Sequence, residues 1–164
     1  MRKARVVSIQ IAARRGEPLQ EVNQVRAVEG QGLEGDRHFG RGDAPGYTRD
    51  LTLIESETLE ALERDHHIKL RRGDSRRNIV TAGISLNHMI GREFRIGEVL
   101  LRGDKLCEPC EDLRGHIGDP AGDALIHRAG LRARIVKGGL IRIGDEIHEC
   151  APALVFAGAA GCEE

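Results

Sequence analysis

The chain is poor in aromatic residues: it has no Trp, one Tyr and three Phe among 164 residues. Proteins that bind single-stranded nucleic acid stack bases on aromatic side chains, and this chain has few of them. Its 25 Lys and Arg residues are balanced by 26 Asp and Glu residues, so the formal net charge is −1. Such a balance creates no general field that attracts nucleic acid or a membrane surface, and we expect neither as a partner.

A long hydrophobic run is also missing. The apolar stretch near the N-terminus is broken by Arg14 and Arg15, so it does not resemble an export signal. The apolar stretch at residues 151–161 is too short to span a bilayer. Because the four Cys residues are unevenly spaced and no export signal is visible, we expect a cytoplasmic protein with reduced thiols.

Hydrophobic periodicity predicts a mainly β fold with a few short helices. A chain of this length fits one domain, which we expect over residues 1–150, with a loosely ordered tail over 151–164. Residues 40–46 form a Gly-rich loop by composition. The expected strands are residues 5–11, 24–29, 51–54 and 78–81; an amphipathic helix is expected at 56–66 and a short helix or turn at 86–90.

Two later segments, residues 92–101 and 139–147, share the pattern apolar-Arg-Ile-Gly-acid. Each alternates like a strand on both sides of a glycine, Gly97 or Gly144. A glycine relieves crowding where a strand turns sharply. We therefore interpret both segments as bends of a closed β-barrel.

The most informative motif is Cys-Glu-Pro-Cys, with Cys107 and Cys110 following an alternating run. Such a pair is typical of a redox centre, of half a zinc site, or of two cysteines with different roles. A second closely spaced pair of zinc ligands is missing, and the surrounding pattern resembles a hairpin rather than a thioredoxin-type unit. Pro109 suits the first position of a helix, which would place Cys110 in the first turn.

Flanking carboxylates oppose ionisation of that thiol, whereas a bound metal would deprotonate it. Cys110 is therefore a better candidate for a ligand to a soft metal than for an unassisted nucleophile. Cys107 belongs to the alternating pattern and fits a buried small residue.

Two polar segments are further candidates. The sequence Gly-Gln-Gly-Leu-Glu-Gly at residues 30–35 matches a dinucleotide fingerprint, but no apolar helical pattern follows it. We interpret it as a loop that presents Asp36, Arg37 and His38 to a cleft. In the segment Ser-Arg-Arg-Asn at residues 75–78, Arg76 and Arg77 are candidates for holding an anion, because Arg binds phosphate with two parallel hydrogen bonds.

Taken in order, these segments resemble the MOSC domain, the C-terminal domain of molybdenum cofactor sulfurases, as a small stand-alone member. The segments that carry the resemblance are residues 32–38, 75–80, 91–97, 106–110, 127–133 and 141–145. The resemblance implies a β-barrel-like fold that binds the molybdenum–pyranopterin cofactor through an invariant cysteine, which matches Cys110.

It further implies that Arg76, Arg77, Asn78, Glu55 and Ser56 contact the cofactor. For Asp36 it suggests a place in the lining of the cleft. Larger relatives carry an additional N-terminal β-barrel region or a pyridoxal-phosphate-dependent region; this sequence has neither, so no pyridoxal phosphate site is expected.

Three functions remain open. The first is reduction of an N-hydroxylated small molecule at molybdenum, with electrons from a separate reductase and with His38 or His116 as proton donor. The second is a carrier of persulfide sulfur or cofactor, which would meet a sulfur donor or acceptor protein. The third is a structural zinc module that needs both Cys107 and Cys110. The sequence does not decide whether the protein is an enzyme.

Overall fold

The computed structural model describes residues 3–41 and 50–151. Within this part of the chain, strands dominate and helices are short, as the periodicity predicts. The expectations for a loop at residues 40–46 and a tail at 151–164 fall almost wholly outside the described residues. No helix in the described ranges is long and apolar enough to cross a membrane.

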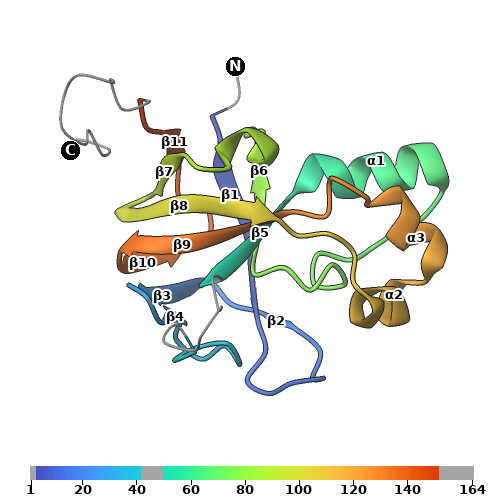
Figure 1. Ribbon diagram of the computed structural model, residues 1–164, viewed down its shortest axis with the longest axis horizontal. Helices are drawn as coiled ribbons and strands as arrows, with labels where there is room; N and C mark the ends of the chain where they lie inside the picture. Colours follow the sequence, from blue (N-terminus) through green and yellow to red (C-terminus); the bar gives the residue numbers. More distant parts are fainter. Residues whose placement is uncertain (1–2, 42–49, 152–164) are drawn as a thin grey trace.

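Eight strands form the larger sheet, in the order β11-β7-β8-β9-β5-β6-β1-β2 (Figure 1). Their bounds are β1 Arg5–Ile11, β2 Gln20–Glu21, β5 Leu51–Glu55, β6 Ile79–Ala82, β7 Glu93–Ile96, β8 Val99–Leu106, β9 Leu131–Lys137 and β11 Ile147–Glu149. All neighbours pair antiparallel except β5 and β6. A parallel pair needs a crossover, which α1 (Ser56–His66) supplies.

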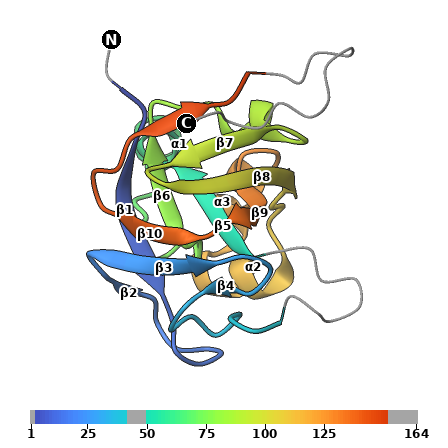
Figure 2. The ribbon, with the colours of Figure 1, turned by 90° about the vertical axis from the view of Figure 1, so that its left-hand side faces the viewer.

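The smaller sheet has three strands, in the order β10-β3-β4. They are β3 Gln24–Val28, β4 Gly32–Leu33 and β10 Gly139–Arg142. Figure 2 shows β3, β4 and β10 beneath β7 and β8 of the larger sheet. Val25 and Ile141 from the smaller sheet share one hydrophobic cluster with Leu53, Phe94 and Leu101 from the larger. The core of the domain therefore lies between the two sheets.

The expected closed barrel is not formed, although the mainly β class is confirmed. The larger sheet ends at the short strands β2 and β11, and the smaller at β4 and β10. Gly97, at φ 55°, reverses the chain into the β7–β8 hairpin, in which Ile96 pairs with Val99. Gly144, at φ 91°, lies where the chain passes from β10 in one sheet to β11 in the other. One glycine thus makes a hairpin and the other a change of sheet, which leaves both sheets open.

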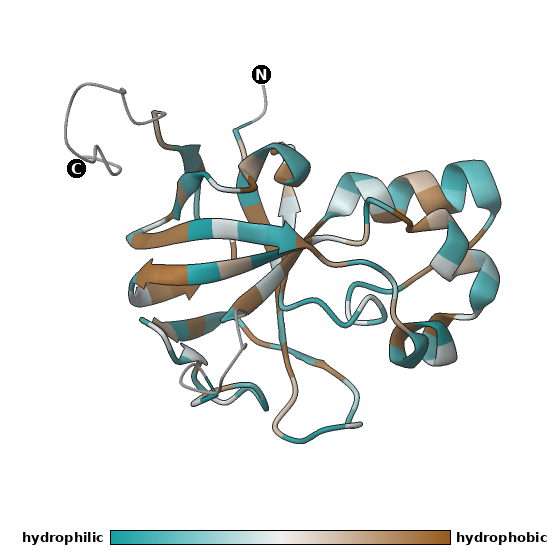
Figure 3. Cartoon of the chain, viewed as in Figure 1, coloured by the Kyte–Doolittle hydropathy of each residue, from teal (hydrophilic) through white to brown (hydrophobic). Residues whose placement is uncertain are grey.

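Three helices gather at one end of the molecule (Figure 1). They are α1, α2 (Glu111–Ile117) and α3 (Asp119–Ala124); a short 3₁₀ helix, η1, spans Leu86–Met89. A second hydrophobic cluster joins Leu59 and Leu62 of α1 to Leu125, just after α3, and to strand residues Ile54 and Val80. Figure 3 shows the resulting pattern, with strands banded in brown and teal and helices carrying teal outward segments. The helical end is thereby fixed to the larger sheet.

Candidate functional site

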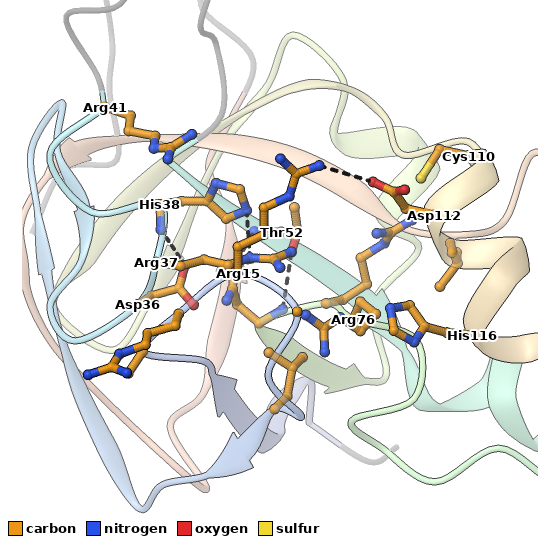
Figure 4. Close-up of a pocket in the computed structure, with 17 residues that line it drawn as sticks. Arg15, Asp36, Arg37, His38, Arg41, Thr52, Arg76, Cys110, Asp112 and His116 are labelled. Carbon is orange, nitrogen blue, oxygen red and sulfur yellow. Dashed lines mark hydrogen bonds and ion pairs between the residues drawn. The ribbon is translucent and has the colours of Figure 1, made fainter.

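A cleft with a volume of about 720 Å³ opens between the β1–β2 connection, the loop after β4 and helix α2 (Figure 4). Its lining is rich in arginine and contains one thiol. The lining residues are Ala13, Arg14, Arg15, Gly16, Leu19, Asp36, Arg37, His38, Arg41, Thr52, Arg76, Arg77, Asn78, Cys110, Asp112, Leu113 and His116. Six arginines face two aspartates there, so the cleft is positively charged although the whole chain is nearly neutral.

The β1–β2 connection contributes Arg14 and Arg15, which the sequence analysis treats only as residues that end an apolar stretch. Arg15 reaches across the cleft toward Asp112 of α2, with 4.0 Å between a guanidinium nitrogen and a carboxylate oxygen (Figure 4). Both side chains are more than four-fifths exposed, so the pair adds little stability. The signal in the sequence is a pair of arginines that follows the strand ending at Ile11 after two alanines.

Cys110 lies at the end of the cleft formed by α2 and is exposed. It is the residue before the first turn of α2, because the helix begins at Glu111 and not at Pro109 as expected. A proline has a fixed φ and no backbone N–H, which suits the start of a helix. Here Pro109 lies two residues before the first residue of α2, Glu111. The thiol therefore projects from a helix boundary into the arginine-rich cleft.

Cys107 is buried, at 2% exposure, and its backbone N–H donates to the Gly130 carbonyl over 2.8 Å. This confirms its interpretation as a small core residue. The motif joins β8 to α2, so the expected hairpin surroundings are wrong. The next strand, β9, pairs antiparallel with β8, and a thioredoxin-type parallel unit is not formed.

Arg76 and Arg77 both line the cleft but are held differently. Arg76 has φ 60°, and its Nη1 donates to the Glu17 carbonyl over 2.6 Å. A non-glycine residue in the left-handed region costs about 1–3 kcal/mol, and such positions cluster at ligand sites. Arg77 is buried, and its Nε donates to the Ala129 carbonyl over 2.8 Å. Each guanidinium is thus anchored to the backbone of another segment at the edge of the cleft.

Asn78 lies at the cleft, but its side chain is used to hold strands together. Its Oδ1 accepts from the Thr52 backbone N–H over 3.1 Å and from the Thr52 hydroxyl over 3.2 Å, while its Nδ2 donates to the Gln10 carbonyl over 3.1 Å. These bonds join β1, β5 and the start of β6. Asn78 therefore supports the floor of the site, and the cofactor contact that the resemblance implies stays a prediction.

Asp36 braces the loop after β4. Its two carboxylate oxygens accept from the backbone N–H groups of Ala12 over 3.2 Å and His38 over 3.3 Å. His38 in turn accepts from Arg37 Nε over 3.2 Å at Nε2. The glycine-rich segment continues into turns and not into a helix, as expected for a loop that is no dinucleotide site. The loop thus brings all three predicted residues, Asp36, Arg37 and His38, to the cleft.

His116 also lines the cleft, from the last turn of α2, whereas Glu55 and Ser56 do not. Glu55 ends β5, three residues beyond Thr52, and a strand rises about 3.3 Å per residue. It lies about 10 Å along the strand from the cleft. Burial raises the pKa of Glu55, and the nearby charge of Glu57 raises it further. The structure therefore brings together Cys110, His38, His116, Arg76, Arg77, Asn78 and Asp36, and separates Glu55 and Ser56 from them.

Metal ligands do not gather anywhere in the described ranges: no group of three or more His, Cys, Asp or Glu side chains there could hold a metal ion. Cys110 shares the cleft with His38, His116, Asp36 and Asp112 without forming such a group. A structural zinc site needs about four protein ligands, so the described residues do not supply one.

Comparison with known proteins adds the family. No curated protein matches the chain. The solved structures that resemble it include the YuaD protein of Bacillus subtilis, with a TM-score of 0.75, 16% identity, and coverage of 89% of this chain and 94% of that one. YiiM from Geobacillus stearothermophilus has a TM-score of 0.68 and 16% identity, with coverage of 90% of this chain and 75% of that one. YiiM from Escherichia coli has a TM-score of 0.67 and 18% identity, with coverage of 91% of this chain and 71% of that one. These likenesses establish the fold. The MOSC domain model matches residues 34–148, and the chain therefore belongs to the MOSC domain family.

Proposed function

We propose that the arginine-lined cleft binds the molybdenum–pyranopterin cofactor, with Cys110 as the protein ligand to molybdenum. The family is linked to this cofactor. The observation that carries the proposal is the combination of one exposed thiol with six arginines in a single cleft.

The chemistry of the lining fits the group. Thiolates suit soft metal centres, and arginine holds phosphate groups such as the one that a pyranopterin carries. A metal that brings ligands of its own, through the dithiolene of the pterin, needs few from the protein. That agrees with a cleft whose described residues offer one thiol and no three-ligand cluster.

In this assignment Arg76 and Arg77 hold the anionic part of the cofactor, because each is already anchored to backbone carbonyls and loses little freedom on binding. Arg14, Arg15 and Arg41 add further positive charge to the lining of the cleft. Asn78 acts indirectly, by fixing the strands that present these side chains.

The bound cofactor supplies two-electron chemistry at an N–O bond. We infer that the reaction is R–NHOH + 2H⁺ + 2e⁻ → R–NH₂ + H₂O, with the electrons delivered by a separate reductase protein. Release of water needs a proton, and the imidazoles of His38 and His116 line the same cleft as Cys110. The side chain of His116 is exposed to solvent.

A second function, sulfur or cofactor carriage, is favoured by one observation. Cys110 is exposed, and a carrier cysteine has to be reached by a donor or acceptor protein. In this alternative the arginines hold the cofactor or an acidic partner segment while Cys110 carries persulfide sulfur.

The deciding experiment measures molybdenum, zinc and labile sulfur per chain in protein from a host that makes the cofactor. The variants are Cys110→Ala and, as a matched control, Cys107→Ala, with folding checked by circular dichroism. We expect molybdenum in the wild type and in Cys107→Ala, and its loss in folded Cys110→Ala. Labile sulfur on Cys110 without molybdenum would support the carrier. Zinc that is lost in both variants would refute both proposals.

A further inference from the structure

The outward face of strands β8 and β9 carries a group of positive charges that lies outside the lining of the cleft. Arg102 on β8 lies opposite Arg134 on β9, and Lys105 lies opposite Arg132. The pairing shifts by one residue at Asp104, a β-bulge, so that Arg102 and Lys105 share a face although they are three positions apart. We call Arg102, Lys105, Arg132 and Arg134 the cationic patch.

Burial along the two strands shows that the cationic patch faces away from the core. The neighbours of its members along the strands include Leu101, Ala133 and Ile135, which are buried, whereas three members of the patch are exposed and Arg132 is partly buried. Among the described residues, none of the four side chains forms an ion pair, and Arg132 Nε is shielded from solvent without a hydrogen-bond partner. The patch is therefore a set of cations turned toward solvent.

Three carboxylates border the cationic patch and neutralise it only in part. Glu93 on β7 lies opposite Arg102, and Asp104 lies in the bulge; both are partly buried. Burial raises the pKa of Asp50, while a backbone hydrogen bond and the charge of Arg134 oppose that shift. Because none of these carboxylates is exposed and most of the cations are, the surface presented to solvent is positive.

The arrangement of the cationic patch is unfavourable in the free chain. Like charges directly opposite each other on neighbouring strands destabilise a sheet, and the patch contains two such pairs in succession. An anionic surface that contacts all four side chains removes this repulsion. The patch thus has the character of a binding surface and not of a stabilising feature.

The cationic patch adjoins the cleft at the end that holds the thiol. Arg132 lies opposite Thr52 of β5, which lines the cleft. Strand β8 carries Lys105 and ends at Leu106, and the Cys-Glu-Pro-Cys segment that contains Cys110 follows directly. Figure 1 shows β8 and β9 side by side, with the end of β8 on the side of the helices. A molecule bound on the patch therefore lies next to the cleft.

We propose that the cationic patch is the docking surface for an acidic segment of a partner protein. Residues on one face of a strand lie about 7 Å apart and neighbouring strands about 4.8 Å apart, so the four cations form a grid that suits a row of carboxylates. One small anion does not reach all four. Nucleic acid fits less well, because the chain has few aromatic side chains and no general positive field.

The proposed function gives this partner a role. In that scheme a separate reductase protein delivers the electrons, and a docked reductase has to lie close to the cleft. The identification of the acidic partner with the reductase rests on the proposed function, whereas the docking surface itself rests on the charges and positions of the four side chains.

The test is calorimetric titration of the purified full chain with a polyglutamate peptide at low salt. The patch variant combines Lys105→Glu with Arg134→Glu, which turns both like-charge pairs into opposite-charge pairs. The matched control combines Arg26→Glu with Arg142→Glu, two exposed arginines of the smaller sheet, and changes the net charge equally. We expect the patch variant to weaken binding about tenfold, equivalent to about 1.4 kcal/mol, and the control by less than about twofold.

Urea unfolding of the same proteins separates binding from folding. The patch variant should be at least as stable as wild type, because the cross-strand repulsion is gone. If it is less stable, Lys105→Glu alone, whose cross-strand neighbour is Arg132, repeats the titration, and its affinity for the peptide should still fall by more than that of Arg26→Glu alone.

Two results would overturn the docking surface. Equal weakening in the patch variant and the control would mean that only net charge matters. Loss of binding confined to Arg14→Glu with Arg15→Glu would place the peptide in the cleft. Tighter binding of a single-stranded oligonucleotide through the patch would refute the choice of partner.

Molybdenum content of wild type and of the patch variant is a separate readout, since no patch residue lines the cleft. A chain that binds the peptide through the patch but never holds molybdenum would refute the proposed function and keep the docking surface. A chain that holds molybdenum but binds the peptide equally well in the patch variant would refute the docking surface alone.

Discussion

Replacing Asn78 by Ala tests whether this residue supports the fold or only touches a ligand. Its side chain bonds to the backbone of two other strands, at Thr52 and Gln10, and is itself only 7% exposed. Asn78→Ala therefore leaves the Thr52 N–H without its acceptor and the Gln10 carbonyl without this donor.

The expected cost follows from those two groups. An unsatisfied buried donor or acceptor costs about 1–3 kcal/mol, so the pair gives about 2–6 kcal/mol. Because Asn78 borders the cleft, water can reach the vacated space and we expect the lower part of that range, about 2–4 kcal/mol. For a domain of this size the melting temperature should fall by about 5–15 °C.

Urea unfolding of the cofactor-free chain measures the effect without any contribution from ligand binding. The control is Asn87→Ala, whose exposed side chain donates to the His127 carbonyl; its loss should change the free energy of unfolding by less than about 0.5 kcal/mol. If Asn78→Ala changed it by less than about 0.5 kcal/mol as well, the strand-linking role argued for Asn78 would be wrong.

Three further predictions concern other parts of the molecule. Burial raises the pKa of Asp50 above its usual 3.8, so the ionised carboxylate destabilises the folded state. This destabilisation is relieved as the pH falls through the raised pKa and the carboxylate takes up a proton. Asp50→Asn should therefore be more stable than wild type in urea at pH 7, by a margin that shrinks toward pH 4. Gly130→Ala should unfold the protein or lower its free energy of unfolding by more than about 3 kcal/mol, because the new Cβ would overlap a carbonyl of β5. The control is Gly91→Ala, where a Cβ at φ 72° meets open space; it should lower the free energy of unfolding by only about 1 kcal/mol in the same assay. Iodoacetamide followed by peptide mapping should label exposed Cys110 at least about tenfold faster than buried Cys107, and equal rates would contradict the burial.

Local sequence determined much of the secondary structure. The strand at Arg5–Ile11 and the helix at Ser56–His66 have the bounds that periodicity predicts. The helix buries one face, whereas the strand is buried on both faces at residues 8–10. The strand expected at 78–81 begins one residue later. Strand β9 and helix α3 are absent from the predicted elements. Strand β9 carries a strand signal all the same, because Leu131, Ala133 and Ile135 alternate with two arginines and are buried. Helix α3 is only six residues long and contains both Pro and Gly, so it has no helical periodicity to detect.

The barrel was not formed for a reason that periodicity does not contain. A glycine between two alternating runs signals a turn, but the pairing partners of the flanking strands decide whether the turn is a corner, a hairpin or a change of sheet. Those partners are distant in the sequence: Leu140 of β10 lies opposite Arg26 of β3, for example.

Part of the candidate site was visible as motifs. Asp36, His38, Arg76 and Cys110 stand out because each lies in a polar or glycine-rich segment next to a strand. Arg15 was missed, since two arginines after a strand are an ordinary end to an apolar run.

The sequence by itself determined the mainly β class and the family, and it singled out Cys110 as the candidate thiol. It does so because alternation, glycine placement and motif order are local properties of the chain. Only the tertiary structure decided which charges share a cleft, that Asn78 is used internally, and that Glu55 lies away from the site. Those outcomes depend on which strands pair and on how far along a strand each side chain lies, and both are fixed only when the whole core packs.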